Sequence, residues 1–161
     1  MKRTVVRRSP VHGKGVFALR PIRAGERVLE YKGEVTTWRR AAARLRRAGA
    51  VGHTFVFGLS SGRVIDGSCG GNSARWLNHA CDANCEAIEE HGRIFIHART
   101  DIAAGAELFI EYGLSVDEPL SPEVISQYQC RCGALSCSTS MLAGVTRSTW
   151  TTNGFTAPLN T

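Results

Sequence analysis

Apolar and polar residues alternate along much of the chain in short runs that end at glycine-containing turns. This pattern is typical of short, half-buried β-strands. The residues Ser60, Ser61 and Gly62 separate two such runs and predict a hairpin. The predicted strands cover residues 4–6, 16–18, 27–31, 54–59, 63–66, 93–98 and 107–110. Many short strands at close intervals indicate a mainly β fold of small sheets, rather than a doubly wound parallel sheet.

One helix interrupts the strands, over residues 37–49. Thr37 is suited to the N-cap position and Gly49 to the left-handed position that ends a helix. Apolar residues recur at three-and-four spacing at Trp38, Ala41, Ala42, Leu45 and Ala48. The opposite face carries Arg39, Arg40, Arg44, Arg46 and Arg47. These arginines form either a solvated face or a contact for phosphate or an acidic partner.

The carboxyl-terminal part of the chain has a weaker pattern. A short helix is predicted within residues 120–128, before the last cysteines. Residues 139–161 are rich in Ser, Thr, Gly and Asn, with few charges and no clear period. Much of this tail is therefore expected to be mobile or tethered only locally.

Length and composition indicate one domain. A chain of 161 residues, 43% of them hydrophobic, can bury a core without disulfides. No apolar run is long enough to span a bilayer, and no apolar block follows the amino-terminal charges, so neither a transmembrane helix nor a secretory signal is expected. The default location is the reducing cytosol, with delivery into a nucleus or another cell left open. The net charge of +6 favours polyanionic or acidic partners.

The densest polar chemistry lies within residues 72–85, which have the sequence NSARWLNHACDANC. Arg75, Asn78 and His79 carry hydrogen-bond donors that are costly to bury unpaired, whereas Trp76 and Leu77 favour burial. We therefore expect the segment to pass through the interior with its polar groups engaged. Two interpretations stay open, a structural turn that bonds only backbone and a ligand site.

Three cysteines near the carboxyl end form the pattern C-x-C-x4-C, at Cys130, Cys132 and Cys137. In a reducing compartment, metal ligands or free thiols are more natural than disulfides. Three thiolates at this spacing can converge on one tetrahedral ion, usually zinc. The fourth ligand must come from elsewhere, and the candidates are Cys69, Cys81, Cys85 or a histidine. Unrelated thiols are the alternative, and a site of four thiolates would be architectural.

Taken together, these motifs resemble the SET-domain protein lysine methyltransferases with a post-SET zinc segment. The resemblance covers roughly residues 12–137, and its parts follow the family's order. They are G-K-G at 13–15, E-Y-x-G-E at 30–34, N-x-A-R-W-L-N-H-x-C at 72–81, G-x-E-L at 105–108 and E-Y at 111–112. The single G-x-G is weak, but the central signature, the E-Y ending and the cysteine pattern together are specific.

The resemblance implies small, mostly antiparallel sheets with a knot-like crossing of the segments around Asn78 and Tyr112. It implies a SET domain over residues 1–119 with an insert helix at about 37–49, a post-SET segment over 120–138 and a tail over 139–161. It also implies that Cys81 completes a zinc site with Cys130, Cys132 and Cys137. Cys85 then remains a free thiol.

S-adenosylmethionine is the methyl donor that the resemblance implies, with catalytic roles for Asn78, His79 and Tyr112. The residues expected to bind the donor are His12, Gly13, Lys14, Gly15, Tyr31, Arg75, Asn78, His79 and Tyr112, together with the neighbourhood of Cys132. The lysine channel is expected at Phe55, Ile110 and Tyr112. Ile110 stands where the family carries Phe or Tyr, and Phe55 where a tyrosine often stands. Both changes remove a hydroxyl, which predicts transfer of more than one methyl group.

The implied function is S-adenosylmethionine-dependent methylation of lysine in a histone-like or other protein. The arginine helix, at residues Arg39 to Arg47, occupies the place of the family's substrate-contacting insert. Its charge favours an acidic-flanked substrate or nearby nucleic acid over a basic histone tail. The alternative function is a zinc-stabilised nucleic-acid-binding module without catalysis, which would bind DNA in a salt-sensitive way. No membrane partner is expected, and the oligomeric state is left open.

Overall fold

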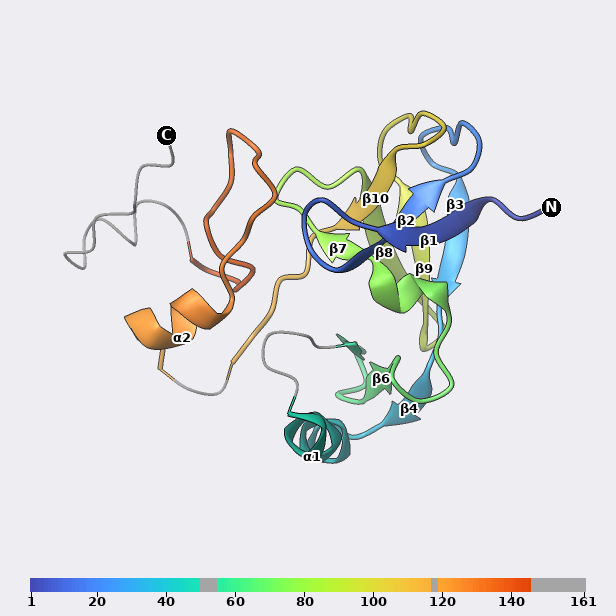
Figure 1. Ribbon diagram of the computed structural model, residues 1–161. Helices are drawn as coiled ribbons and strands as arrows, with labels where there is room; N and C mark the ends of the chain where they lie inside the picture. The colour runs from blue at the N-terminus through green and yellow to red at the C-terminus, as the bar shows by residue number, and fades with distance from the viewer. Residues whose placement is uncertain (50–54, 117–118, 146–161) are drawn as a thin grey trace.

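The computed structural model describes residues 1–49, 55–116 and 119–145 (Figure 1). The strands are β1 Thr4–Arg8, β2 Lys14–Ala18, β3 Arg27–Tyr31, β4 Glu34–Thr36, β5 Val56–Gly58, β6 Val64–Asp66, β7 Asn78–His79, β8 Cys85–Glu90, β9 Arg93–Ala98 and β10 Glu107–Ile110. The helices are α1 Trp38–Ala48, a 3-10 turn η1 Ser73–Trp76 and α2 Pro122–Gln127. The prediction of a mainly β fold with short helices is confirmed. Among the described residues, no helix is long and apolar enough to cross a membrane.

The described strands form three small sheets, ordered β1-β2-β10-β7, β3-β9-β8 and β4-β6-β5. The first sheet joins segments that are distant in sequence. Strand β10 pairs with β2 in antiparallel fashion and with β7 in parallel fashion, with Phe109 opposite Asn78 and Ile110 opposite His79. This parallel pairing places the polar stretch at residues 72–85 beside the strand that leads to Tyr112.

The first two sheets share one core. Its fully buried side chains include Val16 of β2, Leu108 of β10, Ile96 of β9 and Leu77 after η1. Cys85 of β8 belongs to this core, since it is 1% exposed, and burial raises the pKa of its thiol to about 12. The thiol without an assigned role is therefore a small core side chain.

The third sheet carries helix α1, which lies below β4 and β6 in Figure 1. The predicted caps are present. The Thr37 hydroxyl accepts a hydrogen bond from the backbone N–H of Arg40, and Gly49 has φ 62° while its N–H donates to the Arg46 carbonyl. The predicted hairpin is also present as β5 and β6, which pair in antiparallel fashion from Val56 to Asp66. Residue 54, the predicted start of this hairpin, lies outside the described residues.

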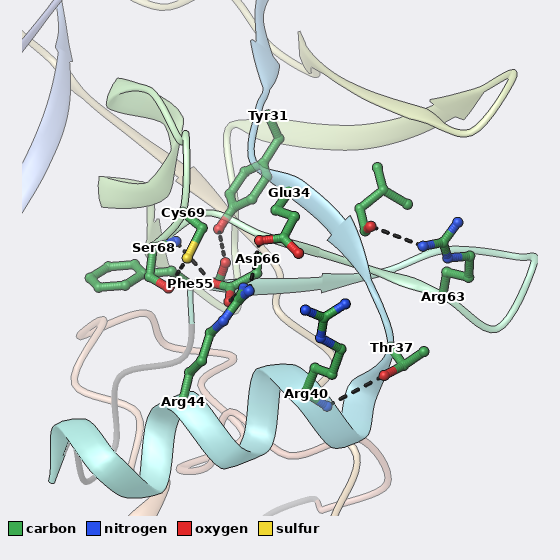
Figure 2. A network of polar contacts seen from close by, with 11 residues as sticks. Tyr31, Glu34, Thr37, Arg40, Arg44, Phe55, Arg63, Asp66, Ser68 and Cys69 are labelled. Atoms are coloured by element: carbon green, nitrogen blue, oxygen red, sulfur yellow. Dashed lines mark hydrogen bonds and ion pairs between the residues drawn. The ribbon is translucent and has the colours of Figure 1, made fainter.

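A buried carboxylate anchors α1 to the third sheet (Figure 2). The Arg44 guanidinium donates to Asp66 Oδ2 at 2.9 Å and to Glu34 Oε2 at 2.7 Å, and Asp66 is 2% exposed. Burial alone raises the pKa of Asp66, but hydrogen bonds from Ser68 and Arg44 outweigh it and hold the pKa below its ordinary value. Arg44 therefore fixes how α1 is rotated on the sheet.

The Arg44→Met substitution is expected to lower the free energy of unfolding by about 2 kcal/mol at neutral pH, between the values for exposed and buried ion pairs. A depressed folded-state pKa stabilises the protein above the unfolded-state pKa of Asp, about 3.9, and this stabilisation is lost as the pH falls through the folded-state value. The difference in the free energy of unfolding between wild type and variant should therefore become smaller below about pH 4. Urea denaturation across pH measures this difference, with Arg39→Met, a substitution at an exposed arginine of α1, as the control. A gap that is constant with pH would contradict the assignment.

The segment after the last cysteine is partly held in place. The Met141 N–H donates to the Tyr128 carbonyl at 2.8 Å, and the Ala143 N–H donates to the Leu114 carbonyl at 2.8 Å. Ser140 is 1% exposed and Leu142 is 4% exposed. Residues 139–145 thus pack against the segment that follows Tyr112 and against the end of α2. The rest of the predicted tail, residues 146–161, lies outside the described residues.

Candidate active site

Asn78 ties the central stretch to the turn that precedes β2. Its side-chain Nδ2 lies 3.2 Å from the His12 carbonyl oxygen, 2.9 Å from the Lys14 carbonyl oxygen and 2.8 Å from Glu107 Oε1. Asn78 is 8% exposed. The amide therefore fixes the position of His12 relative to β7, and it is satisfied by protein groups, as a buried donor should be.

Glu107 is a buried residue of this site to which sequence analysis assigned no role. It is 9% exposed and accepts hydrogen bonds from Asn78 and from the Ser9 hydroxyl, the latter at 2.9 Å. A Cβ atom on Gly15 would lie 2.0 Å from Glu107 Oε1, so Gly15 is required by the close approach of this carboxylate. The available signal was the G-x-E-L motif at residues 105–108.

The Glu107→Ala substitution is expected to lower the free energy of unfolding by about 2–3 kcal/mol, because it leaves the Asn78 amide and the Ser9 hydroxyl without their buried acceptor. Glu107→Gln should lower the free energy of unfolding by less, since its amide oxygen can still accept a hydrogen bond from Asn78. Urea denaturation measures both variants, and Glu86→Ala on the exposed face of β8 is the control. Equal stability of Glu107→Ala and the control would rule out this role.

His79 is oriented by the backbone of the next segment. Its Nδ1 accepts a hydrogen bond from the Tyr112 N–H at 3.0 Å, so the neutral ring carries its proton on Nε2, which lies 3.4 Å from Cys81 Sγ. Burial lowers the pKa of His79, and the nearby charge of Glu111 only partly opposes this. The ring is therefore a neutral link between the Tyr112 backbone and the cysteine cluster.

Tyr112 is held as a neutral phenol. Its hydroxyl donates to the Leu77 carbonyl at 2.5 Å, and its ring meets His79 edge-on with 5.4 Å between centroids. Burial raises the pKa of Tyr112 above its ordinary value, and the charge of Glu107 adds to the effect. Because the hydroxyl proton is donated to the Leu77 carbonyl, the lone pairs of the Tyr112 oxygen can accept from another group.

Two cavities flank Tyr112. The first has a volume of about 220 Å³, and its lining includes His12, Asn78 and His79 as well as Gln129, Arg131 and Met141 of the carboxyl-terminal segment. The second has a volume of about 580 Å³ and is lined by Tyr31, Phe57, Leu77 and Ile110, among others. Of the described residues, Tyr112 alone lines both cavities. Tyr112 therefore stands at their junction.

Four cysteines converge beside the first cavity. Their sulfur atoms all lie within 4.8 Å of one another, and Cys81 Sγ is 3.7 Å from Cys130 Sγ and 3.8 Å from Cys137 Sγ. Four sulfurs at about 2.3 Å from a tetrahedral zinc would be about 3.8 Å apart, so the cluster of Cys81, Cys130, Cys132 and Cys137 fits this ion. Four thiolates leave no open position, which makes the site architectural.

The comparisons with known proteins agree with this arrangement. A family model described as SET domain matches residues 13–113 of the chain. The chain belongs to the SET domain family.

The relatives of this SET domain include histone-lysine methyltransferases. It is 36% identical over 138 residues to an H3 lysine-4 specific histone-lysine N-methyltransferase of Yarrowia lipolytica. That match covers 81% of this chain and 11% of the Yarrowia protein. It is 34% identical over 136 residues to the histone-lysine N-methyltransferase set1 of Dictyostelium discoideum. That match covers 81% of this chain and 9% of the Dictyostelium protein. The chain thus spans about a tenth of the length of these curated relatives.

Solved structures show the same fold at similar identity. A humanized mutant of the Chaetomium thermophilum Polycomb Repressive Complex 2, bound to the inhibitor GSK126, matches with a TM-score of 0.62 and 35% identity, over 70% of this chain and 15% of that one. An active polycomb repressive complex 2 in the stimulated state matches with a TM-score of 0.64, again at 35% identity and with the same coverage.

Most residues predicted for the donor site of the SET domain come together, but in two groups. His12, Asn78, His79 and Tyr112 line the first cavity, whereas Tyr31 and Arg75 line the second. Gly13 has φ 46°, and its carbonyl accepts from the Ser9 N–H at 2.8 Å. The Lys14 ammonium lies 4.7 Å from the centre of the Trp76 ring, so the side chain points to Trp76, while the backbone carbonyl of Lys14 accepts a hydrogen bond from Asn78.

The predicted lysine-channel residues divide in a similar way. Ile110 and Tyr112 line the second cavity. Phe55 is not among the lining residues of either cavity. Its ring meets Trp76 edge-on at 5.1 Å, and its carbonyl accepts from the Tyr31 hydroxyl at 2.8 Å. Phe57 lines the second cavity instead, and it was missed, although residues two apart on a strand lie on the same face.

Proposed function

We propose that this chain transfers methyl groups from S-adenosylmethionine to lysine side chains of a protein. The observation that supports it most strongly is the position of Tyr112 between the two cavities. A donor on the His79 side and a lysine on the Ile110 side would meet at the Tyr112 hydroxyl. The names of the relatives, histone-lysine N-methyltransferases, support the same reaction.

The residues of the first cavity suit the donor. His12, Asn78 and His79 form a rigid polar wall, because each is held by the hydrogen bonds of the Asn78 amide or of the Tyr112 backbone. The opposite wall, at Gln129 and Arg131, belongs to the segment that the cysteine cluster holds. When bound, S-adenosylmethionine would supply a methyl group on a positively charged sulfur.

The second cavity suits the acceptor. A lysine amine has an ordinary pKa of about 10.4 and must lose its proton before it can attack a methyl group. The apolar side chains of Phe57, Leu77 and Ile110 lower the pKa of a lysine placed among them, because burial disfavours the charged form. Holding the amine in line with the methyl group contributes about 7–11 kcal/mol to lowering the barrier.

Tyr112 contributes a fixed oxygen at the junction. Its proton is held by the Leu77 carbonyl, and its raised pKa keeps it protonated near neutral pH. The phenol thus acts through its lone pairs, which favour the partial positive charge on the methyl group and amine during transfer. General-base catalysis by this residue is not required.

The alternative of a nucleic-acid-binding module without catalysis is not favoured, since it gives no account of two cavities that meet at one buried phenol. We place the substrate among protein lysines, histone or other. A reducing compartment suits a cluster in which all four cysteines are free to bind metal.

The test is incubation of the protein with a methyl donor carrying a radiolabelled methyl group and a whole-cell or nuclear extract. Labelled protein bands are expected with the wild type and are expected to be lost with Asn78→Ala, which removes the anchor of the His12 turn. Acid hydrolysis of the bands should release methylated lysine. Labelling that persists unchanged in the variant, or that appears on residues other than lysine, would overturn the proposal.

More than one methyl group is expected on each lysine. Ile110 is 3% exposed and lines the second cavity without a hydroxyl that could hold the amine in one orientation. With excess donor and long incubation, mass spectrometry should show di- or trimethylated peptide. Ile110→Tyr should shift the product towards monomethyl, and Ile110→Val serves as the control. Monomethyl product alone from the wild type would contradict this expectation.

A further inference from the structure

The second cavity carries positive charge and, among its described lining residues, no carboxylate. Its charged lining side chains are Arg46 of α1 and Arg75 of η1. Tyr31 and Tyr112, two of its three tyrosines, add no negative charge, since burial raises the pKa of both. The described lining residues therefore give this cavity a positive charge, which repels further lysines and arginines and attracts carboxylates.

One stripe of α1 faces this cavity. Trp38, Ala42 and Arg46 lie at positions i, i+4 and i+8, which follow one another along one side of a helix, and all three line the cavity. Trp38 is 45% exposed, and Arg46 is also exposed. The stripe thus offers an apolar ring and a guanidinium to whatever occupies the cavity.

Arg46 differs from its neighbour Arg44 in having no ion-pair partner among the described residues. Arg44 is committed to Asp66 and Glu34, and Figure 2 shows it reaching from α1 to both carboxylates. That ion-pair network fixes the rotation of α1 and so holds the Arg46 stripe towards the cavity. A guanidinium at a cavity wall that forms no ion pair within the described part of the chain is suited to bind a carboxylate through two parallel hydrogen bonds.

From these observations we infer that the chain selects lysines flanked by an acidic residue, whose carboxylate binds Arg46 beside Trp38. This inference rests on the proposed function, because it takes the second cavity as the entrance of the substrate lysine. It adds the substrate class, a lysine in an acidic context rather than in a run of basic residues.

The test uses the whole 161-residue chain and short synthetic peptides with one lysine in an Ala, Gly and Ser background. A single Glu is moved one residue at a time on either side of the lysine, and matched peptides carry Gln or a second, trimethylated lysine at the same place. At one or more of these positions, kcat/KM for the peptide with Glu is expected to exceed kcat/KM for the peptide with Gln by about tenfold. This is the factor that one hydrogen bond between charged groups contributes. The trimethylated lysine, which is cationic, should be the poorest.

Two charge reversals on α1 distinguish a direct contact between Arg46 and the peptide from an effect of the protein's net charge. Arg46→Glu should invert the preference so that the cationic peptide becomes better than the Glu peptide. Arg47→Glu makes the same change in net charge at a residue that is exposed and does not line the cavity, and it should keep the wild-type order. Equal effects of the two variants, or no preference in the wild type, would overturn the inference.

Peptide binding, measured by fluorescence anisotropy with the same set, keeps the inference testable apart from catalysis. Tighter binding of the Glu peptide that depends on Arg46, with no methyl transfer to any peptide, would support the inference and contradict the proposed reaction. Methyl transfer to the peptides without a preference for Glu would support the proposed reaction and contradict the inference.

Discussion

Replacing Tyr112 with phenylalanine is expected to lower kcat by about 10²–10³-fold, the usual cost of removing one polar group that stabilises a transition state. The substitution removes the oxygen at the junction of the two cavities and keeps the aromatic ring that packs on His79. Affinity for the donor should change little, because the donor wall at His12, Asn78 and His79 does not use the phenol oxygen. Single-turnover methyl transfer and calorimetric titration of S-adenosylmethionine measure the two quantities separately.

Tyr31→Phe is a matched control for this experiment. The Tyr31 hydroxyl also donates to a backbone carbonyl, that of Phe55 at 2.8 Å, and Tyr31 lines the second cavity but not the first. Both variants leave one carbonyl without its donor, at a cost of about 1–3 kcal/mol in stability. Only Tyr112→Phe should lose the chemical step. An equal loss of kcat in the two variants would mean that the junction has no special role.

The strands that could be predicted from the sequence are those with a clear local pattern. Residues 93–98 and 107–110 were predicted with the bounds that β9 and β10 have, because alternation and a glycine turn mark both. Strand β7 was missed, since two residues are too few to show a period. Its parallel pairing with β10 joins segments about thirty residues apart, and no local pattern carries that information. Yet this pairing is what brings Asn78 and His79 to Tyr112.

The site could be predicted as a set of residues but not as two cavities. The motifs pointed to His12, Asn78, His79 and Tyr112, which do share one cavity. Sequence alone could not tell that Tyr31 lines the second cavity and not the first, because that depends on the packing of Tyr31 in β3 against Phe57 in the third sheet. Nor could it tell that Phe57 rather than Phe55 lines the second cavity, because strand β5 begins only at Val56 and the Phe55 ring packs on Trp76.

Glu107 shows a different limit of sequence analysis. An acidic residue within a strand is usually exposed, and the apolar neighbours Leu108 and Ile110 do not indicate what a buried carboxylate would bind. Its partners, Asn78 and Ser9, are 29 and 98 residues away in the chain. Such a group becomes intelligible only when the hydrogen bonds are known, since burial without partners would be too costly.

Removing the metal is expected to abolish donor binding while leaving the three sheets folded. The wall of the first cavity at Gln129, Arg131 and Met141 belongs to the segment that the cysteine cluster holds, and the described core lies mostly in other elements. Binding of structural zinc to peptides releases about 10–16 kcal/mol, far more than the short helix α2 could supply alone. Without metal, this wall should therefore detach, and His79 should lose the sulfur that faces its Nε2.

A chelator titration, with zinc followed by mass spectrometry and donor affinity by calorimetry, measures this coupling. Cys137→Ser should weaken donor binding at least about tenfold with little change in the far-ultraviolet circular dichroism of the sheets. Cys69→Ser is the matched control, because Cys69 is a half-buried thiol outside the cluster and lines neither cavity. If donor affinity followed zinc content in neither variant, the cluster would stabilise the carboxyl-terminal segment without shaping the donor site. Loss of both zinc and donor affinity in Cys137→Ser, with neither lost in Cys69→Ser, is the result that this coupling predicts.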